Sequence, residues 1–158
     1  MRAIHRPRRH AAFTLLAALA VLAPATLAGC SEGKKDWFLP ASQLPEGWTY
    51  AYGPREADAG EKARFGDAAE QVRVAGLQGP SGGTGAIVVV RFNEESAAER
   101  AANAANCDGM QLYHILRSGD TVAFLGIGGS GAAANEARAA MDDVARKMAS
   151  RTGARQAC

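Results

Sequence analysis

The chain has 158 residues, of which 47% are hydrophobic and 22% charged, a composition typical of globular proteins. This composition excludes a wholly disordered chain, a collagen-like chain and a small disulfide-dense protein, and the length predicts one domain with room for a tail. The formal net charge of +2 comes from an excess of basic residues at the N-terminus.

The first 29 residues have the three parts of a secretory signal peptide. Residues 1–10 contain four arginines and no acidic residue, Ala11–Ala23 is an apolar stretch rich in Leu and Ala, and small residues follow Pro24. A positive segment, an apolar segment and a small-residue cleavage site together direct export. We therefore predict that residues 1–29 are a signal peptide.

The tetrapeptide Leu27-Ala28-Gly29-Cys30 resembles the lipobox of bacterial lipoprotein precursors. The resemblance implies that Cys30 receives a diacylglyceryl group, that the chain is cut before it, and that the new α-amine is acylated, for instance with palmitate. It also implies an exported protein of the cell envelope, anchored to the outer membrane or to the outer face of the cytoplasmic membrane. Residues 30–36 would then be a lipidated polar tether.

Three other interpretations of this segment remain open. Ordinary secretory cleavage after Ala28 is one, and a twin-arginine signal at Arg8-Arg9 is another, although the surrounding residues match that pattern poorly. The third is an uncleaved membrane helix, for which about 18 marginally apolar residues are short.

Removal of the signal peptide reverses the sign of the charge. The segment holds four of the 18 basic residues and none of the 16 acidic ones, so the chain from Cys30 onward carries a net −2. Lys34-Lys35 is the one basic run left, and we therefore expect no nucleic-acid partner.

Two cysteines remain besides Cys30. Export permits disulfides, and we predict that Cys107 and Cys158 form one that closes a large loop. Two free thiols are the alternative. The spacing differs from Cys-x-x-Cys, so a redox-active pair is not expected.

Residues 37–158 are predicted to form a single α+β domain. β-forming residues and apolar patterning predict strands at 48–52, 71–77, 86–92, 110–117 and 121–128. The continuous apolar run of the third strand predicts a central position, with both of its faces buried. Residues 118–120 would join the last two strands as a hairpin.

Two helices complete the predicted domain. The first begins at the N-cap Asn93 and runs to about residue 106, with small alanines facing the sheet. The second covers about 132–151, with Gly153 as its C-terminal cap and an apolar stripe at Ala137, Met141, Val144 and Met148. Residues 55–69 are predicted to be a loop with at most one weak helix. The order is strand, strand, strand, helix, strand, strand, helix, which predicts a mainly antiparallel sheet of about five strands with two helices packed on it.

Glycine-rich residues before the last helix match two catalytic or cofactor motifs in part. Gly126, Gly128 and Gly131 have the spacing of a dinucleotide fingerprint, but no further strand follows to complete the βαβ unit, so we expect no cofactor. Ser130 lies in a near match to the nucleophile elbow, and His114 could serve it as a base with Asp120 or Asp108 as orienter.

The remaining candidate site is a group of aromatic residues near the start of the domain. Trp37, Trp48, Tyr50 and Tyr52 could form a ligand-binding rim close to the membrane, or could pack into the core instead. One His and two cysteines outside the lipidation site are too few ligands for a zinc site, so no metal is expected.

These observations favour a non-enzymatic, lipid-anchored envelope domain that binds an envelope protein or a small ligand. The alternative function is a small envelope hydrolase using Ser130 and His114.

Overall fold

The computed structural model describes residues 36–105 and 112–157, all of which belong to one compact unit that spans residues 34–158. The predicted signal peptide, the lipidation site Cys30, most of the tether and both remaining cysteines lie outside the described residues. Within the described ranges, no helix is both long enough and apolar enough to cross a membrane.

The domain is built on one antiparallel sheet of six strands, in the order β1-β2-β3-β5-β4-β6. The α+β class and the antiparallel sheet predicted from the sequence are confirmed, whereas the predicted number of five strands is one too low. The strands are β1 Thr49–Glu56, β2 Ala69–Gln78, β3 Thr84–Phe92, β4 Leu112–Ser118, β5 Thr121–Gly128 and β6 Arg155–Gln156.

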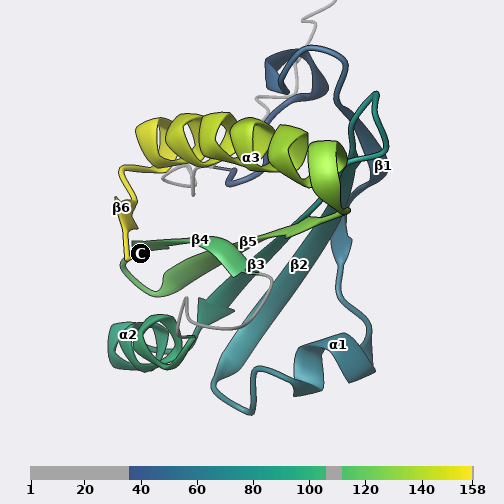
Figure 1. Ribbon diagram of the computed structural model, residues 1–158. Helices are drawn as coiled ribbons and strands as arrows, with labels where there is room; N and C mark the ends of the chain where they lie inside the picture. Colours follow the sequence, from purple (N-terminus) through teal and green to yellow (C-terminus); the bar gives the residue numbers. More distant parts are fainter. Residues whose placement is uncertain (1–35, 106–111, 158) are drawn as a thin grey trace, which may run out of the picture. The chain divides into compact units, whose positions relative to one another are not determined.

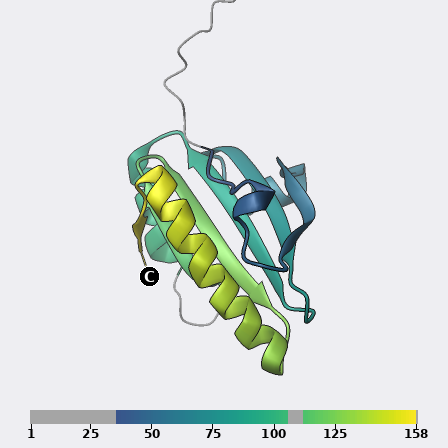
Figure 2. The ribbon, with the colours of Figure 1, turned by 90° about the horizontal axis from the view of Figure 1, so that it is seen from above.

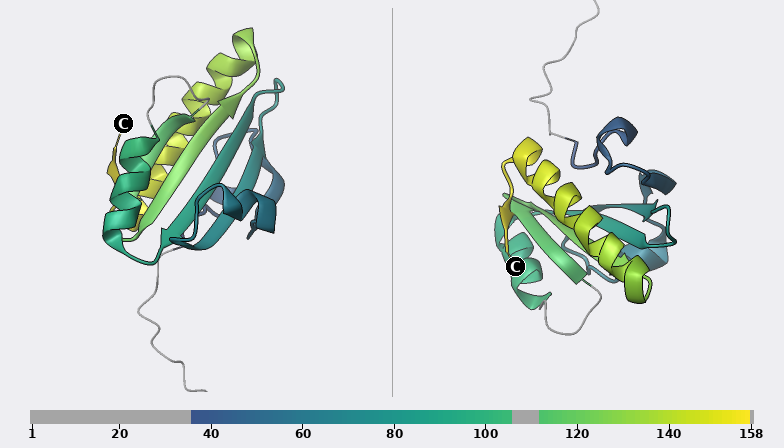
Figure 3. Two further views of the ribbon diagram at one scale, coloured as in Figure 1. Left: turned by 90° about the horizontal axis from the view of Figure 1, so that it is seen from below. Right: turned by 45° about the horizontal axis from the view of Figure 1, so that its top comes forward.

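Helices cover both faces of the sheet. The long helix α3 (Gly131–Thr152) lies on one face, and α2 (Glu95–Ala104) lies on the other, together with the short α1 (Ala59–Ala63) (Figures 1 and 3). We call these the α3 face and the α2 face. The segment 36–48, which includes the 3-10 turn Ala41–Gln43, lies beside α3 on the same face (Figure 2). Lys147 of α3 holds it by donating to the carbonyl oxygen of Gln43 at 2.9 Å.

Each face of the sheet has its own hydrophobic core, and β3 contributes to both. Ile87 and Val89 point to the α3 face, whereas Val90 and Phe92 point to the α2 face. This alternation explains why the strand is a continuous apolar run, and it confirms the predicted central position. The predicted apolar stripe of α3 is also confirmed, because all four of its residues are buried.

The ends of the helices agree with the predictions only in part. Gly153 ends α3 in the left-handed conformation, as predicted. The N-cap of α2 is Glu94 rather than Asn93, and its side chain makes no capping hydrogen bond. The weak helix expected within 55–69 is α1, which begins with a capping box between Asp58 and Glu61.

The sixth strand, β6, is the strand that was not predicted from the sequence. It contains only Arg155 and Gln156, and it pairs with the edge of β4 after α3 has crossed the sheet. Two polar residues carry no periodicity from which a strand could be predicted. The pairing returns the C-terminal part of the chain to the sheet next to β4.

Candidate functional site

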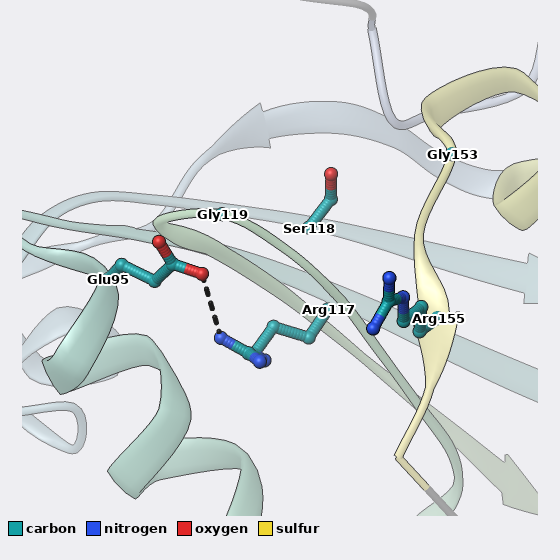
Figure 4. A pocket seen from close by; sticks show the side chains of 6 residues that line it. All are labelled: Glu95, Arg117, Ser118, Gly119, Gly153 and Arg155. Carbon is teal, nitrogen blue, oxygen red and sulfur yellow. Dashed lines mark hydrogen bonds and ion pairs between the residues drawn. The ribbon is translucent and has the colours of Figure 1, made fainter.

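A polar pocket of about 270 Å³ lies where β4, β6 and the end of α3 meet the start of α2 (Figure 4). Three charged side chains line it, Glu95, Arg117 and Arg155, together with Ser118, Gly119 and Gly153. None of these residues was a candidate site residue in the sequence analysis. Arg155 joins the others only through the pairing of β6 with β4, and Glu95 meets Arg117 only through the packing of α2 on the sheet.

The two arginines of the pocket occupy opposite positions on neighbouring strands. Arg117 of β4 and Arg155 of β6 are direct partners in the antiparallel register. Their side chains therefore lie on the same face of the sheet, which is the α2 face because Arg117 contacts Glu95 of α2. Figure 4 shows Arg155 extending from β6 toward the strand that carries Arg117. Like charges directly opposite each other on two strands repel.

One acidic side chain offsets part of this positive charge. Nη1 of Arg117 lies 3.3 Å from Oε1 of Glu95. Within residues 36–105 and 112–157, Arg155 forms no ion pair or side-chain hydrogen bond. The three charged groups of the pocket therefore carry a net charge of +1, located mainly on Arg155.

Two glycines with positive φ shape the ends of the pocket. Gly119 (φ 56°) is in the two-residue turn between β4 and β5, and Gly153 (φ 72°) caps α3. A β-carbon on either one would have no atom within 4 Å, so the space above both residues is open. Left-handed backbone favours glycine at these positions, and the absence of side chains keeps the pocket accessible.

On the opposite face of the same strands, His114 is at the centre of a hydrogen-bonded cluster. Its Nε2 lies 2.8 Å from Oδ1 of Asp142 on α3, and its Nδ1 lies 2.8 Å from Nε2 of Gln156 on β6. The hydroxyl of neighbouring Tyr113 donates to Asp142 at 3.5 Å. Partial burial, and then the nearby charge of Asp142, raise the pKa of Tyr113 above its usual value. The cluster ties β6 and α3 to β4.

The structure does not bring Ser130 and His114 together. Ser130 is the N-cap of α3, whereas His114 contacts Asp142, twelve residues further along the same helix. At 1.5 Å per residue these helical positions are about 18 Å apart. Both ring nitrogens of His114 already have partners. The proposed orienter Asp120 accepts a hydrogen bond from Thr121 instead, and Asp108 lies outside the described residues.

The four candidate aromatic residues do not form a common rim. Trp48 is 6% exposed and belongs to the core on the α3 face, against which Trp37 and Tyr50 pack. Tyr50 also donates its hydroxyl to the carbonyl oxygen of Leu39 at 2.7 Å. Tyr52 is 46% exposed, covers Gly76 and lies under the guanidinium of Arg55. Three of the four therefore take the packing role that the sequence analysis left open as the alternative.

A second pocket, of about 390 Å³, lies between α1 and the start of β2. Its one basic residue, Lys62, donates to the carbonyl oxygen of Glu70 at 2.9 Å, so its charge is already engaged. Neither pocket is lined by the aromatic candidates. In the part of the chain that the structure describes, no three potential metal ligands are grouped together.

Comparison of the chain with protein-family models, with curated proteins and with solved structures gave no match.

Proposed function

We propose that this chain is a lipid-anchored protein of the bacterial cell envelope, whose domain binds a ligand or a partner without chemical turnover. The lipobox at Leu27-Ala28-Gly29-Cys30 supports the anchor. The domain packs immediately after the tether, since Phe38 and Leu39 are each only 2% exposed. Seven residues span at most about 25 Å when fully extended, so the tether would keep the domain close to the membrane surface.

The observation that supports the binding role most strongly is the pocket with two arginines at opposite positions of β4 and β6. Arg155 has no ion-pair partner among the described residues, and the pocket around it is open to solvent. A catalytic role has less support, because Ser130 and His114 are far apart and His114 is held by Asp142 and Gln156. A site that holds a charged group, with no nucleophile paired to a base, is suited to recognition rather than to group transfer.

We also propose that Cys107 and Cys158 form a disulfide in the exported protein. Both cysteines lie outside the described residues, but their described neighbours support the pairing. Ala157 donates its backbone N–H to the carbonyl oxygen of Ile115 at 2.7 Å, and β6 runs toward the beginning of β4. Cys107 precedes the first residue of that strand, Leu112, by five positions.

The anchor is tested by producing the full chain in a bacterium and separating membrane from soluble fractions. We expect the native chain in the membrane fraction, and Cys30→Ala to lose both lipid labelling and membrane retention. Cys107→Ala is the matched control, because it also replaces one cysteine by alanine but leaves the lipobox intact. Equal membrane retention of Cys30→Ala and Cys107→Ala, with lipid labelling in neither, would contradict the proposal.

A further inference from the structure

The pocket between Arg117 and Arg155 has the charge and size of a site for a small carboxylate. We infer that it binds the carboxylate group of a small organic acid, an inference that rests on the proposal that this domain binds a ligand. We base it on the two arginines that line the pocket, on Glu95, which pairs with Arg117, and on the volume of the pocket.

The charge of the pocket favours a group with one negative charge. Glu95 is 3.3 Å from Arg117, so the three charged groups sum to +1, and a single carboxylate neutralises them. A phosphate group carries nearly two negative charges at neutral pH and would leave the site negative, beside a carboxylate that repels it. The pocket therefore discriminates by charge between the two common kinds of oxyanion.

The geometry of the two arginines suits a planar, two-oxygen ligand. Each guanidinium presents its N–H donors in a planar fork that matches the two oxygens of a carboxylate. Because Arg117 and Arg155 occupy directly opposite positions on β4 and β6, both side chains start from neighbouring points on one face of the sheet. A carboxylate between them would accept hydrogen bonds from Arg155 and relieve the repulsion between the two cations.

The volume of the pocket limits the size of the ligand. At about 270 Å³ it is slightly smaller than the roughly 300–1,000 Å³ typical of pockets for drug-sized molecules. The lining is polar, and Arg155 and Glu95 are exposed, so solvent weakens each charge interaction. The negative end of α3, at Gly153, also offsets part of the charge of Arg155. We therefore expect affinities in the millimolar range for a simple acid.

The inference is tested by nuclear magnetic resonance on the full chain, purified from membranes in detergent and labelled with nitrogen-15. The amides of Gly119 and Gly153 are the reporters, because both residues line the pocket. Sodium propionate is the probe, and sodium chloride and sodium phosphate at equal ionic strength are the comparisons. We expect saturable shifts of both glycine amides with propionate, and at least tenfold weaker binding with phosphate.

Three variants make the test specific. Arg155→Gln should weaken propionate binding at least tenfold, because it removes the cation that has no partner among the described residues. The matched control is Arg138→Gln on α3, whose arginine contacts Asn135 and lines neither pocket; it should bind propionate like the native chain. Glu95→Gln raises the net charge of the pocket to +2, so it should tighten phosphate binding more than propionate binding.

Each outcome decides between the alternatives. Equal shifts with chloride and propionate, or equal loss of binding in Arg155→Gln and Arg138→Gln, would overturn the inference. Phosphate binding that is tighter than propionate binding in the native chain would show that the ligand class is wrong. None of these results changes the lipidation of Cys30, so failure of this inference is distinguishable from failure of the proposed anchor.

Discussion

The imidazole of His114 lies 2.8 Å from the carboxylate of Asp142 through its Nε2, and this contact joins β4 to α3. The other ring nitrogen contacts Gln156, so one side chain of β4 connects this strand both to α3 and to β6. The side chain of His114 is only 12% exposed, whereas that of its partner Asp142 is 46% exposed. The cluster therefore holds β6 against β4 and, with it, keeps Arg155 in place opposite Arg117.

Loss of the His114 side chain is expected to destabilise the domain and release β6. His114→Ala removes a mostly buried side chain and its two hydrogen bonds, for an expected loss of about 1–3 kcal/mol in the free energy of unfolding. Urea unfolding measures this loss. Hydrogen exchange at the amide of Ala157, which bonds to Ile115, should also become faster.

Arg100→Ala is the control for this prediction, because its ion pair with Glu94 is exposed and belongs to α2. We expect it to change stability by less than about 0.5 kcal/mol and to leave the exchange of Ala157 unchanged. Equal exchange rates at Ala157 in both variants would show that His114 does not hold β6.

Close packing of the β2–β3 turn against α3 gives a second prediction. A β-carbon on Gly83 would lie 2.7 Å from the backbone carbonyl oxygen of Ala133, which cannot move aside like the end of a side chain. Gly83→Ala should therefore destabilise the domain by about 1–3 kcal/mol. Gly53→Ala is the matched control, since nothing lies within 4 Å of its β-carbon. We expect it to be neutral or slightly stabilising in thermal unfolding, and a similar loss in both variants would refute the packing argument.

The hydrogen bond from Tyr50 to Leu39 predicts a pH-dependent contribution to stability. Burial, and then the charge of Asp36, raise the pKa of Tyr50 above its usual value of 10.0. A raised pKa means that this stabilisation is complete below pH 10.0 and is lost as the pH rises through the folded-state pKa. Tyr50→Phe should lose about 0.5–1.5 kcal/mol at pH 7 and show a smaller decline in stability above pH 10. An unchanged alkaline decline in the variant would contradict this assignment.

The proposed disulfide predicts that the mature protein has no free thiol. Alkylation under denaturing, non-reducing conditions should leave the peptides of Cys107 and Cys158 unlabelled. Reduction should then lower stability by about 2–4 kcal/mol. Cys107→Ser and Cys158→Ser should each remove the effect of reduction, and two labelled cysteines in the native protein would refute the bond.

Local patterns were sufficient to predict the central elements of this fold. The apolar run at β3 predicted a buried central strand, and the spacing of Met141 and Val144 predicted which side of α3 meets the sheet. Both signals are strong because hydrophobic burial on a regular element imposes a period on the sequence. The signal for β6 is missing, because its two residues form a strand only through pairing with β4 and the contact between Gln156 and His114.

The candidate site could not be predicted for the same reason. Arg117 and Arg155 are 38 residues apart in the chain, and each resembles an ordinary surface arginine until the strand register places them opposite each other. The predicted contact between Ser130 and His114 was wrong for the opposite reason, since a sequence motif was present but the two residues are far apart. The near match to a nucleophile elbow suggested that His114 could reach Ser130. In the sheet, however, His114 is opposite Leu125, and the remaining residues of β5 separate Leu125 from Ser130.

We propose above that the chain is a lipoprotein whose mature form begins at Cys30. Mass spectrometry of the N-terminal peptide, released from the membrane-bound protein by protease digestion, tests it most directly. We predict that this peptide begins at Cys30 and carries a diacylglyceryl group with an acylated α-amine. An unmodified N-terminus at Gly29, or an intact peptide that still includes residues 1–29, would contradict the account.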